Sequence, residues 1–227
     1  MSTPQQSSGH VEPGGPGWSV DLGSARVRKI SVSEMDNNVY LITCTVTGER
    51  LLIDAADDPE RILELLREED GTTELGQVLT THGHWDHHRA LEAVVAATGA
   101  RTLAGEADAD DLPVPVDVRL GDGGLLRVGN LILDIISLRG HTPGSVALAL
   151  STAGDQSRTL LFTGDSLFPG GPGKTGSPED FTRLMDDLQE RVFAPYADHA
   201  VVLPGHGDNT TLGAERPQLP QWRARGW

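Results

Sequence analysis

The residues with the clearest capacity for chemistry lie in one short segment, residues 81–88, which reads Thr-His-Gly-His-Trp-Asp-His-His. His82 and His84 are two positions apart, so on an extended backbone both imidazoles point the same way and can bind one metal ion. Asp86 and His87 follow within reach of a second ion, and imidazole with carboxylate suits a borderline divalent metal. A chance match to His-x-His-x-Asp-His in such a chain has odds of about one in a thousand. The segment predicts a two-metal site in preference to a solvated, histidine-rich turn.

Three later residues share the setting of this segment. His141, Asp165 and His206 each come shortly after an apolar run, and each has a glycine beside it. Glycine allows the backbone and side chain to come close to an ion. Taken singly, each would be an ordinary turn or loop residue. The repeated context predicts that all three join the histidine segment in space.

Short strands and helices must position these residues. Apolar, β-branched or leucine-rich runs predict strands at residues 25–32, 38–46, 50–55, 77–81, 101–104 and 200–204, with several more within 113–163. Apolar residues at helical spacing predict helices at residues 60–69, 90–98 and 178–192. The order of these elements suggests two similar halves around facing sheets, with a second sheet within residues 113–163.

Length and charge limit the classes of protein. A chain of 227 residues suits one domain, which we place at residues 18–227. Residues 1–17 consist mainly of Ser, Gln, Gly and Pro with almost nothing to bury, so we expect a flexible tail. The net charge of −15 repels phosphate backbones and anionic headgroups, which argues against nucleic-acid and membrane partners.

The single cysteine and the N-terminal segment indicate the compartment. Cys44 lies in an apolar strand and is expected to be an inert core thiol, because one cysteine makes no intrachain disulfide or CxxC site. The first residues lack the basic start and apolar core of a secretory signal, and no apolar run has membrane-spanning length. We therefore expect a soluble, cytoplasmic protein.

In sequence order, these motifs resemble the metallo-β-lactamase superfamily over about residues 25–210: Asp54, the His82–His87 segment, His141, Asp165 and His206. The resemblance implies an α+β fold, an αββα sandwich of two facing mixed sheets flanked by helices, with the site along one edge. It also implies that His82, His84 and His141 bind one metal, that Asp86, His87 and His206 bind the other, and that Asp165 bridges both. Asp54 is then expected to order the histidine loop by hydrogen bonds. Two divalent ions per chain follow, with zinc expected and iron or manganese as alternatives.

Within the superfamily the chain looks most like the glyoxalase II branch, the hydroxyacylglutathione hydrolases. Residues 36–42, 140–145 and 163–168 resemble motifs of that branch, and Gly171-Pro172-Gly173-Lys174 follows at the expected place. Pro172 stands where the branch usually has cysteine, whereas the basic residue near the thiol portion of the substrate is retained as Lys174. Glutathione-specific members carry a helical C-terminal domain, but this chain continues for only about twenty residues after His206. The resemblance is therefore to a short form, and a different small thiol is an alternative to glutathione.

The resemblance implies hydrolysis of a small-molecule thioester. Two cations sharing a water lower its pKa, so that a metal-bridging hydroxide attacks the carbonyl carbon. Asp86 is the expected catalytic side chain, since a carboxylate there orients the nucleophile. A thiolate leaving group needs little help from an acid. Lys174 and Arg139 are expected to pair with a carboxylate on the thiol carrier, which makes the substrate an anionic thioester.

Three other functions stay open at the level of sequence. A persulfide dioxygenase of the same fold uses a single iron, and a lactonase or β-lactamase would direct the same hydroxide at a cyclic ester or lactam. A non-catalytic metal-binding protein would use the C-terminal segment as an interaction element. We expect that segment to fold back and bury Trp222 and Trp227. The thiol, the acyl group and the oligomeric state are not specified by the sequence.

Overall fold

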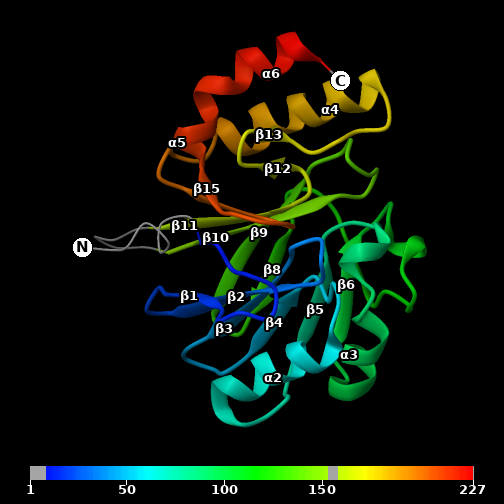
Figure 1. Ribbon diagram of the computed structural model, residues 1–227, viewed down its shortest axis with the longest axis vertical. Coiled ribbons are helices and arrows are strands. Elements are labelled where there is room, and N and C mark those ends of the chain that lie inside the picture. Colours follow the sequence, from blue (N-terminus) through cyan, green and yellow to red (C-terminus); the bar gives the residue numbers. More distant parts are fainter. Residues whose placement is uncertain (1–8, 153–157, 227) are drawn as a thin grey trace.

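The computed structural model describes residues 9–152 and 158–226. Two mixed sheets face each other, with α2 and α3 outside one sheet and α4, α5 and α6 outside the other (Figure 1). This is the αββα sandwich that the sequence predicts. The α-helices are α2 (Pro59–Asp70), α3 (Leu91–Thr98), α4 (Pro178–Asp187), α5 (Leu212–Glu215) and α6 (Leu219–Arg225).

The first sheet follows the chain order from β1 to β7. Its first four strands are antiparallel and the remaining pairs are parallel. Neighbouring side chains along a strand point to opposite faces, so Leu41 packs toward α2 and α3 while Ile42 packs toward the second sheet. The strands are β1 (Trp18–Asp21), β2 (Ala25–Val32), β3 (Asn37–Cys44), β4 (Arg50–Ile53), β5 (Gln77–Thr80), β6 (Arg101–Gly105) and β7 (Val118–Leu120).

The second sheet has the order β15-β14-β11-β10-β9-β8, with β11 and β14 parallel. The sequence predicts this sheet within residues 113–163, but β7 pairs with β6 and belongs to the first sheet. A separate hairpin of β12 (Leu167–Phe168) and β13 (Gly171–Pro172) is too short to give a sequence signal. The strands are β8 (Leu125–Val128), β9 (Leu131–Ser137), β10 (Val146–Ser151), β11 (Thr159–Gly164), β14 (Val201–Pro204) and β15 (Thr210–Thr211).

Local signals fix the ends of the longer helices. The Asp58 side chain accepts a hydrogen bond from the backbone nitrogen of Arg61 at the start of α2, and Gly71 ends that helix with φ 83°. At the start of α4, the Ser177 side chain accepts a hydrogen bond from the backbone nitrogen of Asp180. The predicted helix 178–192 divides into α4 and a π-helical turn, Leu188–Phe193, so the predicted length is close but the last turn is wider.

Both ends of the described chain lie against the body. We expect residues 1–17 to have almost nothing to bury, but Val11 is buried against the body; residues 1–8 lie outside the described part. Trp222 on α6 is 3% exposed and packs against Phe193, as the fold-back prediction requires, whereas Trp227 is outside the described residues. None of the helices in the described ranges has the length and apolar character needed to cross a bilayer.

Candidate metal centre

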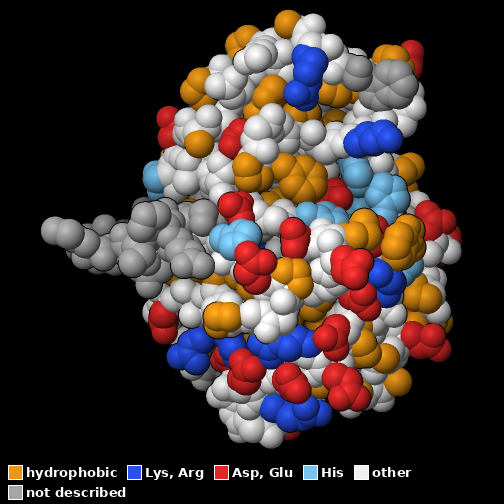
Figure 2. Space-filling view, in the orientation of Figure 1, with side chains coloured by type: hydrophobic (Ala, Val, Ile, Leu, Met, Phe, Trp, Pro, Cys, Tyr) orange, Lys and Arg blue, Asp and Glu red, His pale blue; other side chains and the backbone are white. Residues whose placement is uncertain are grey.

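Four loops bring the predicted site residues to one edge of the sandwich. The histidine segment leaves β5 and contains a short 3-10 turn, Trp85–His87. His141 lies between β9 and β10, Asp165 follows β11, and His206 follows β14. Figure 2 shows histidine side chains at the surface between the half of the molecule with α4 and the half with α2. One strand of the first sheet, β5, and three strands of the second, β9, β11 and β14, therefore end at this position.

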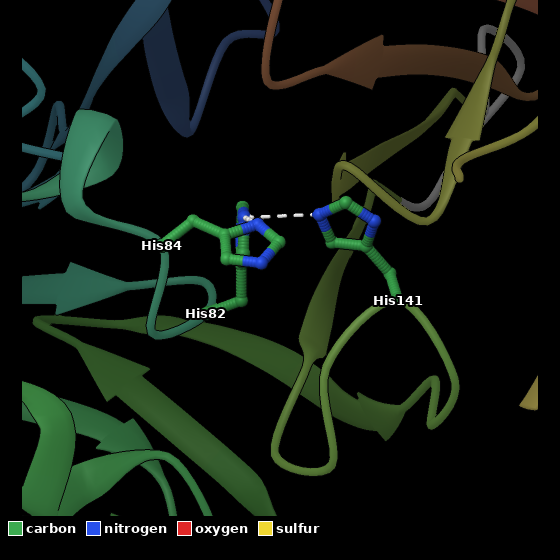
Figure 3. Close-up of side chains that lie close together, drawn as sticks. All are labelled: His82, His84 and His141. Carbon is green, nitrogen blue, oxygen red and sulfur yellow. Dashed lines mark hydrogen bonds between the residues drawn. The ribbon is translucent and has the colours of Figure 1, made fainter. Parts of the chain in front are cut away.

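The first group is His82, His84 and His141, whose ring nitrogens lie within 4.8 Å of one another. Nε2 of His82 is 3.1 Å from Nδ1 of His84 and 3.3 Å from Nε2 of His141. Figure 3 shows the three rings turned toward one another, two from one loop and one from another. Three convergent imidazoles are a ligand set that zinc accepts.

The second group is Asp86, His87 and His206. Nε2 of His206 lies 3.1 Å from Nε2 of His87 and 3.3 Å from Oδ2 of Asp86. Asp165 lies between the two groups, because its Oδ2 is 3.4 Å from Nε2 of His206 and 3.8 Å from Nε2 of His141. The structure thus brings together all of the residues that the sequence predicts as metal ligands.

The electrostatics of this site call for a cation. Asp54, Asp86 and Asp165 lie together, and in the described ranges their ion-pair partners are histidines, with no Lys or Arg among them. Oδ1 of Asp165 is buried, and its contact with Nε2 of His87 at 3.4 Å is an ion pair without hydrogen-bond geometry. A buried carboxylate oxygen without a hydrogen bond is costly unless an ion binds it. These nitrogen and oxygen donors fit divalent metal ions.

The pKa shifts of the metal-binding residues follow from their burial and from the charges next to them. Burial lowers the pKa of His82, and the nearby His87 lowers it further. Burial alone would lower the pKa of His87, but the charge of Asp54 and the close contact with Asp165 raise it to about 10. Burial would also raise the pKa of Asp165, yet the imidazoles of His206 and His87 hold it far below its usual range. A metal ion on His87 would take the place of that proton.

Asp54 holds the histidine segment at Thr81 and at His87. Its Oδ1 accepts a hydrogen bond from the backbone nitrogen of Thr81 at 2.7 Å, and its Oδ2 accepts one from the Thr81 hydroxyl at 2.9 Å. The same Oδ2 lies 2.9 Å from Nδ1 of His87. The contact leaves Nε2 of His87 directed at the second group, which is the role expected of this carboxylate from the sequence.

Two further supporting residues were not predicted. Nδ2 of Asn37 donates to Oδ2 of Asp86 at 3.1 Å. Asp108 is buried and accepts hydrogen bonds from the backbone nitrogens of Gly83 and Gly144 at 2.8 and 2.6 Å, which joins the His82–His84 loop to the His141 loop. Asn37 stands in a motif quoted for the family resemblance, but the acidic run around Asp108 resembles a solvated turn and gives no signal.

Glycine at position 205 is required by close packing. A Cβ atom there would lie 2.2 Å from Oδ1 of Asp165 and 2.7 Å from Cε1 of His87. Any side chain would therefore push the metal-binding groups apart. The sequence-based argument that glycines beside the ligands allow close approach holds at this position.

Lys174 lies beside the first group. Nδ1 of His141 is 2.7 Å from the backbone oxygen of Lys174. A cavity of about 310 Å³ adjoins this contact and is lined by residues 172–175, Phe181, Arg225 and Gly226. Within the described ranges neither Lys174 nor Arg225 forms an ion pair, so both charges are available to an anion.

Arg139 has a different role from the one expected. Its Nε and Nη2 donate to the buried carboxylate of Asp187 at 2.9 and 2.7 Å, and its backbone nitrogen donates to the same group. Arg139 does not line the cavity beside Lys174. Its charge is already compensated, which contradicts the expected contact with a substrate carboxylate.

Proteins of known name or structure are similar to this chain in sequence or in fold. Hydroxyacylglutathione hydrolase of Cereibacter sphaeroides is 39% identical over 61% of this chain and 51% of that protein, so the matched region spans about half the length of this relative. Hydroxyacylglutathione hydrolase GloC of Haemophilus influenzae is 29% identical over 74% of this chain and 85% of that protein. The crystal structure of ETHE1 from Myxococcus xanthus superposes with a TM-score of 0.72 at 29% identity, covering 87% of this chain and 84% of that one. The family model of the metallo-beta-lactamase superfamily matches residues 32–206, and the chain therefore belongs to that superfamily.

Proposed function

We propose that the protein is a metal-dependent hydrolase that cleaves the thioester of a small, anionic thiol, in the manner of the glyoxalase II branch. The observation that carries this proposal is the pair of ligand groups that meet at Asp165. His82, His84 and His141 would hold one divalent ion, Asp86, His87 and His206 the other, and Asp165 would bind both. Zinc is the metal that we propose, and iron and manganese are the alternatives that the same donors accept.

Two ions bound there would activate a water and polarise the carbonyl group of the substrate. Asp86 would position this water. Its side chain is 10% exposed, and Asn37 holds Oδ2 by a hydrogen bond, so the group has a fixed orientation toward the site. We infer that Asp86 accepts a hydrogen bond from the attacking water and aims it at the carbonyl carbon.

The substrate's thiol carrier would occupy the cavity beside Lys174. Phe181 and Pro172 give this cavity an apolar wall, and Lys174 and Arg225 give it two cations. In a chain of net charge −15, such a pair is a local exception that favours a carboxylate. Arg225 takes the place that the sequence analysis assigned to Arg139.

The relatives support the thioester assignment. Both curated relatives are named hydroxyacylglutathione hydrolase, and the one from Haemophilus influenzae matches this chain over 85% of its own length. A thioester of glutathione or of another small thiol carrying a carboxylate is therefore the substrate class that we propose. A cytoplasmic location stays a prediction.

A persulfide dioxygenase is the second candidate, and the likeness to ETHE1 favours it. The two functions differ in metal and in co-substrate. Elemental analysis of the purified protein, paired with a thioester hydrolysis assay and an oxygen-uptake assay with a persulfide, separates them. Two zinc ions per chain with thioester hydrolysis would support the proposal; one iron with oxygen uptake would replace it by the second candidate.

A further inference from the structure

The loop that carries His206 is held by the opposite half of the molecule. It follows β14 of the second sheet, yet its carbonyl groups accept hydrogen bonds from β3 of the first sheet. Nδ2 of Asn38 donates to the oxygens of Pro204 and Gly207 at 2.9 and 3.0 Å, and the Tyr40 hydroxyl donates to Pro204 at 2.7 Å. The position of His206 therefore depends on contacts between the two sheets.

Lys29 on β2 lies at the centre of these contacts. It pairs in register with Tyr40, and its side chain is 0% exposed. Its Nζ donates to the backbone oxygens of Gly207 and Gly9 at 2.6 and 2.9 Å, and to Oδ1 of Asn209 at 3.0 Å. An ammonium group has three hydrogens, so all of its donors are used.

The charge of Lys29 is not explained by an ion pair. Lys29 belongs to none of the ion pairs formed within the described ranges, so no carboxylate oxygen there lies within 4 Å of its Nζ. Burial lowers the pKa of Lys29 to about 8, against the opposing effect of Asp208 and Asp36, so the group is still protonated at neutral pH. Val27, two positions earlier on the same face, belongs to the apolar core between the sheets. An apolar side chain would fill this place without the desolvation cost, so the ammonium has a polar task.

The N-terminal segment takes part in the same arrangement. Gly9 has φ 60°, and a Cβ there would lie 1.7 Å from Nδ2 of Asn209. Nδ1 of His10 lies 2.6 Å from Oδ1 of Asp208. Residues 9–10 therefore lie directly against the loop after His206, and Lys29 binds both segments.

We propose that Lys29 is a positioning residue which fixes the loop 204–209 and so sets His206 in the second metal-binding group. The proposal rests on the metal centre of the proposed function. The path is short: Gly207, which Lys29 binds, follows His206 directly. Nδ1 of His206 lies 2.7 Å from the oxygen of Met35, and its Nε2 faces Asp86.

The test is a zinc titration of the metal-free Lys29→Met variant, combined with hydrogen–deuterium exchange of the metal-free protein. Methionine keeps the volume and removes the donors. Zinc at the first group should bind with the affinity of the unsubstituted chain. Zinc at the second group should bind about tenfold to a hundredfold more weakly than in the unsubstituted chain. Amides at residues 205–209 should exchange faster, while those at residues 82–87 should not change. A purely structural role would lower thermal stability without separating the two zinc affinities.

Asp108→Ala is the matched control, because Asp108 supports the loops of the first group instead. It should weaken zinc binding by the first group and leave the exchange of residues 205–209 unchanged. If Lys29→Met does not fold, Asn209→Ala and Gly9→Ala change the acceptors of Lys29 in place of Lys29 itself. Both should also weaken zinc binding at the second group.

A folded Lys29→Met variant with two zinc affinities and loop exchange equal to those of the unsubstituted chain would overturn the proposal. Failure of the metal centre itself would look different. The unsubstituted chain would then bind no zinc, while faster exchange at residues 205–209 in metal-free Lys29→Met would still support the role of Lys29 in the loop.

Discussion

Nδ1 of His87 lies 2.9 Å from Oδ2 of Asp54, and both side chains are almost completely buried. A carboxylate on one ring nitrogen fixes the tautomer and orientation of an imidazole, so that the other nitrogen is free to bind a metal. Asp54 also holds the backbone of Thr81, where β5 ends and the histidine segment begins. One carboxylate thus positions both the start of the segment and its most buried ring.

Asp54→Ala should weaken binding of the ion at the second group by about tenfold to a hundredfold. The substitution leaves Nδ1 of His87 without its partner and frees the loop at Thr81. The measurement is zinc content after dialysis against a competing chelator. Asp21→Ala, in an exposed strand position, is the control and should retain its metal. Equal zinc content in both variants would contradict the role of Asp54.

Removing the metal should abolish hydrolysis and lower the thermal stability. Without an ion, the groups that offset the charge of Asp86 and Asp165 among residues 9–152 and 158–226 are neighbouring imidazoles. An ion that binds only the folded state stabilises it by mass action. The measurement is thermal unfolding and thioester hydrolysis before chelation, after chelation and after zinc is returned. Full activity in a chelated sample shown to be free of metal would exclude a metal-dependent reaction.

Asp86→Ala should lower turnover by several orders of magnitude. The substitution removes both a metal ligand and the group that orients the water, and it leaves Asn37 without an acceptor at Oδ2. Because lost metal alone would lower the rate, the assay uses protein loaded with zinc and checked for two ions per chain. Asp110→Ala, an exposed carboxylate, should keep its rate. Near-normal hydrolysis by metal-loaded Asp86→Ala would refute the assignment.

Trp222→Ala should destabilise the protein by about 3–5 kcal/mol, the usual cost of removing a buried aromatic side chain. Trp222 is 3% exposed and packs on the helical layer beside Phe193. The measurement is the free energy of unfolding from urea denaturation. Trp85→Ala is the comparison, because Trp85 is 59% exposed and should change that free energy by much less. A loss for Trp222→Ala as small as that expected for exposed Trp85 would contradict a stabilising role for the packing of α6.

The histidine segment could be predicted because its signal is local: the spacing of His82 and His84 determines where their rings point. Asp165 and His206 are single residues, and they were found only because their contexts repeat and resemble a known family. The sequence also predicted most strands and the three longer helices, since their apolar patterns have the right period. The short β12–β13 hairpin has no such period.

The errors at the site come from long-range partners. Arg139 reads as a free cation, but Asp187 neutralises it from 48 positions away. Lys29 reads as part of an ordinary strand, although its ammonium group binds Gly207 from 178 positions away. A sequence shows which residues carry charge, whereas the partner of a charge depends on how the sheets pack.

Lys174→Ala should raise KM about tenfold for a thioester whose thiol carrier has a carboxylate, with little change in kcat. One charge-assisted hydrogen bond on a partly exposed surface is worth about 1.4 kcal/mol, which is a factor of ten in affinity. Lys174 lies beside the bound thiol in the proposed arrangement and does not touch the reacting carbonyl, so the effect should fall on KM. A thioester with a neutral carrier should show no change, and Arg183→Ala, whose charge is paired with Asp180 on α4, should behave like the unsubstituted chain. An unchanged KM for the anionic thioester would exclude Lys174 as the carboxylate-binding residue and leave Arg225 as the only other cation of the described cavity.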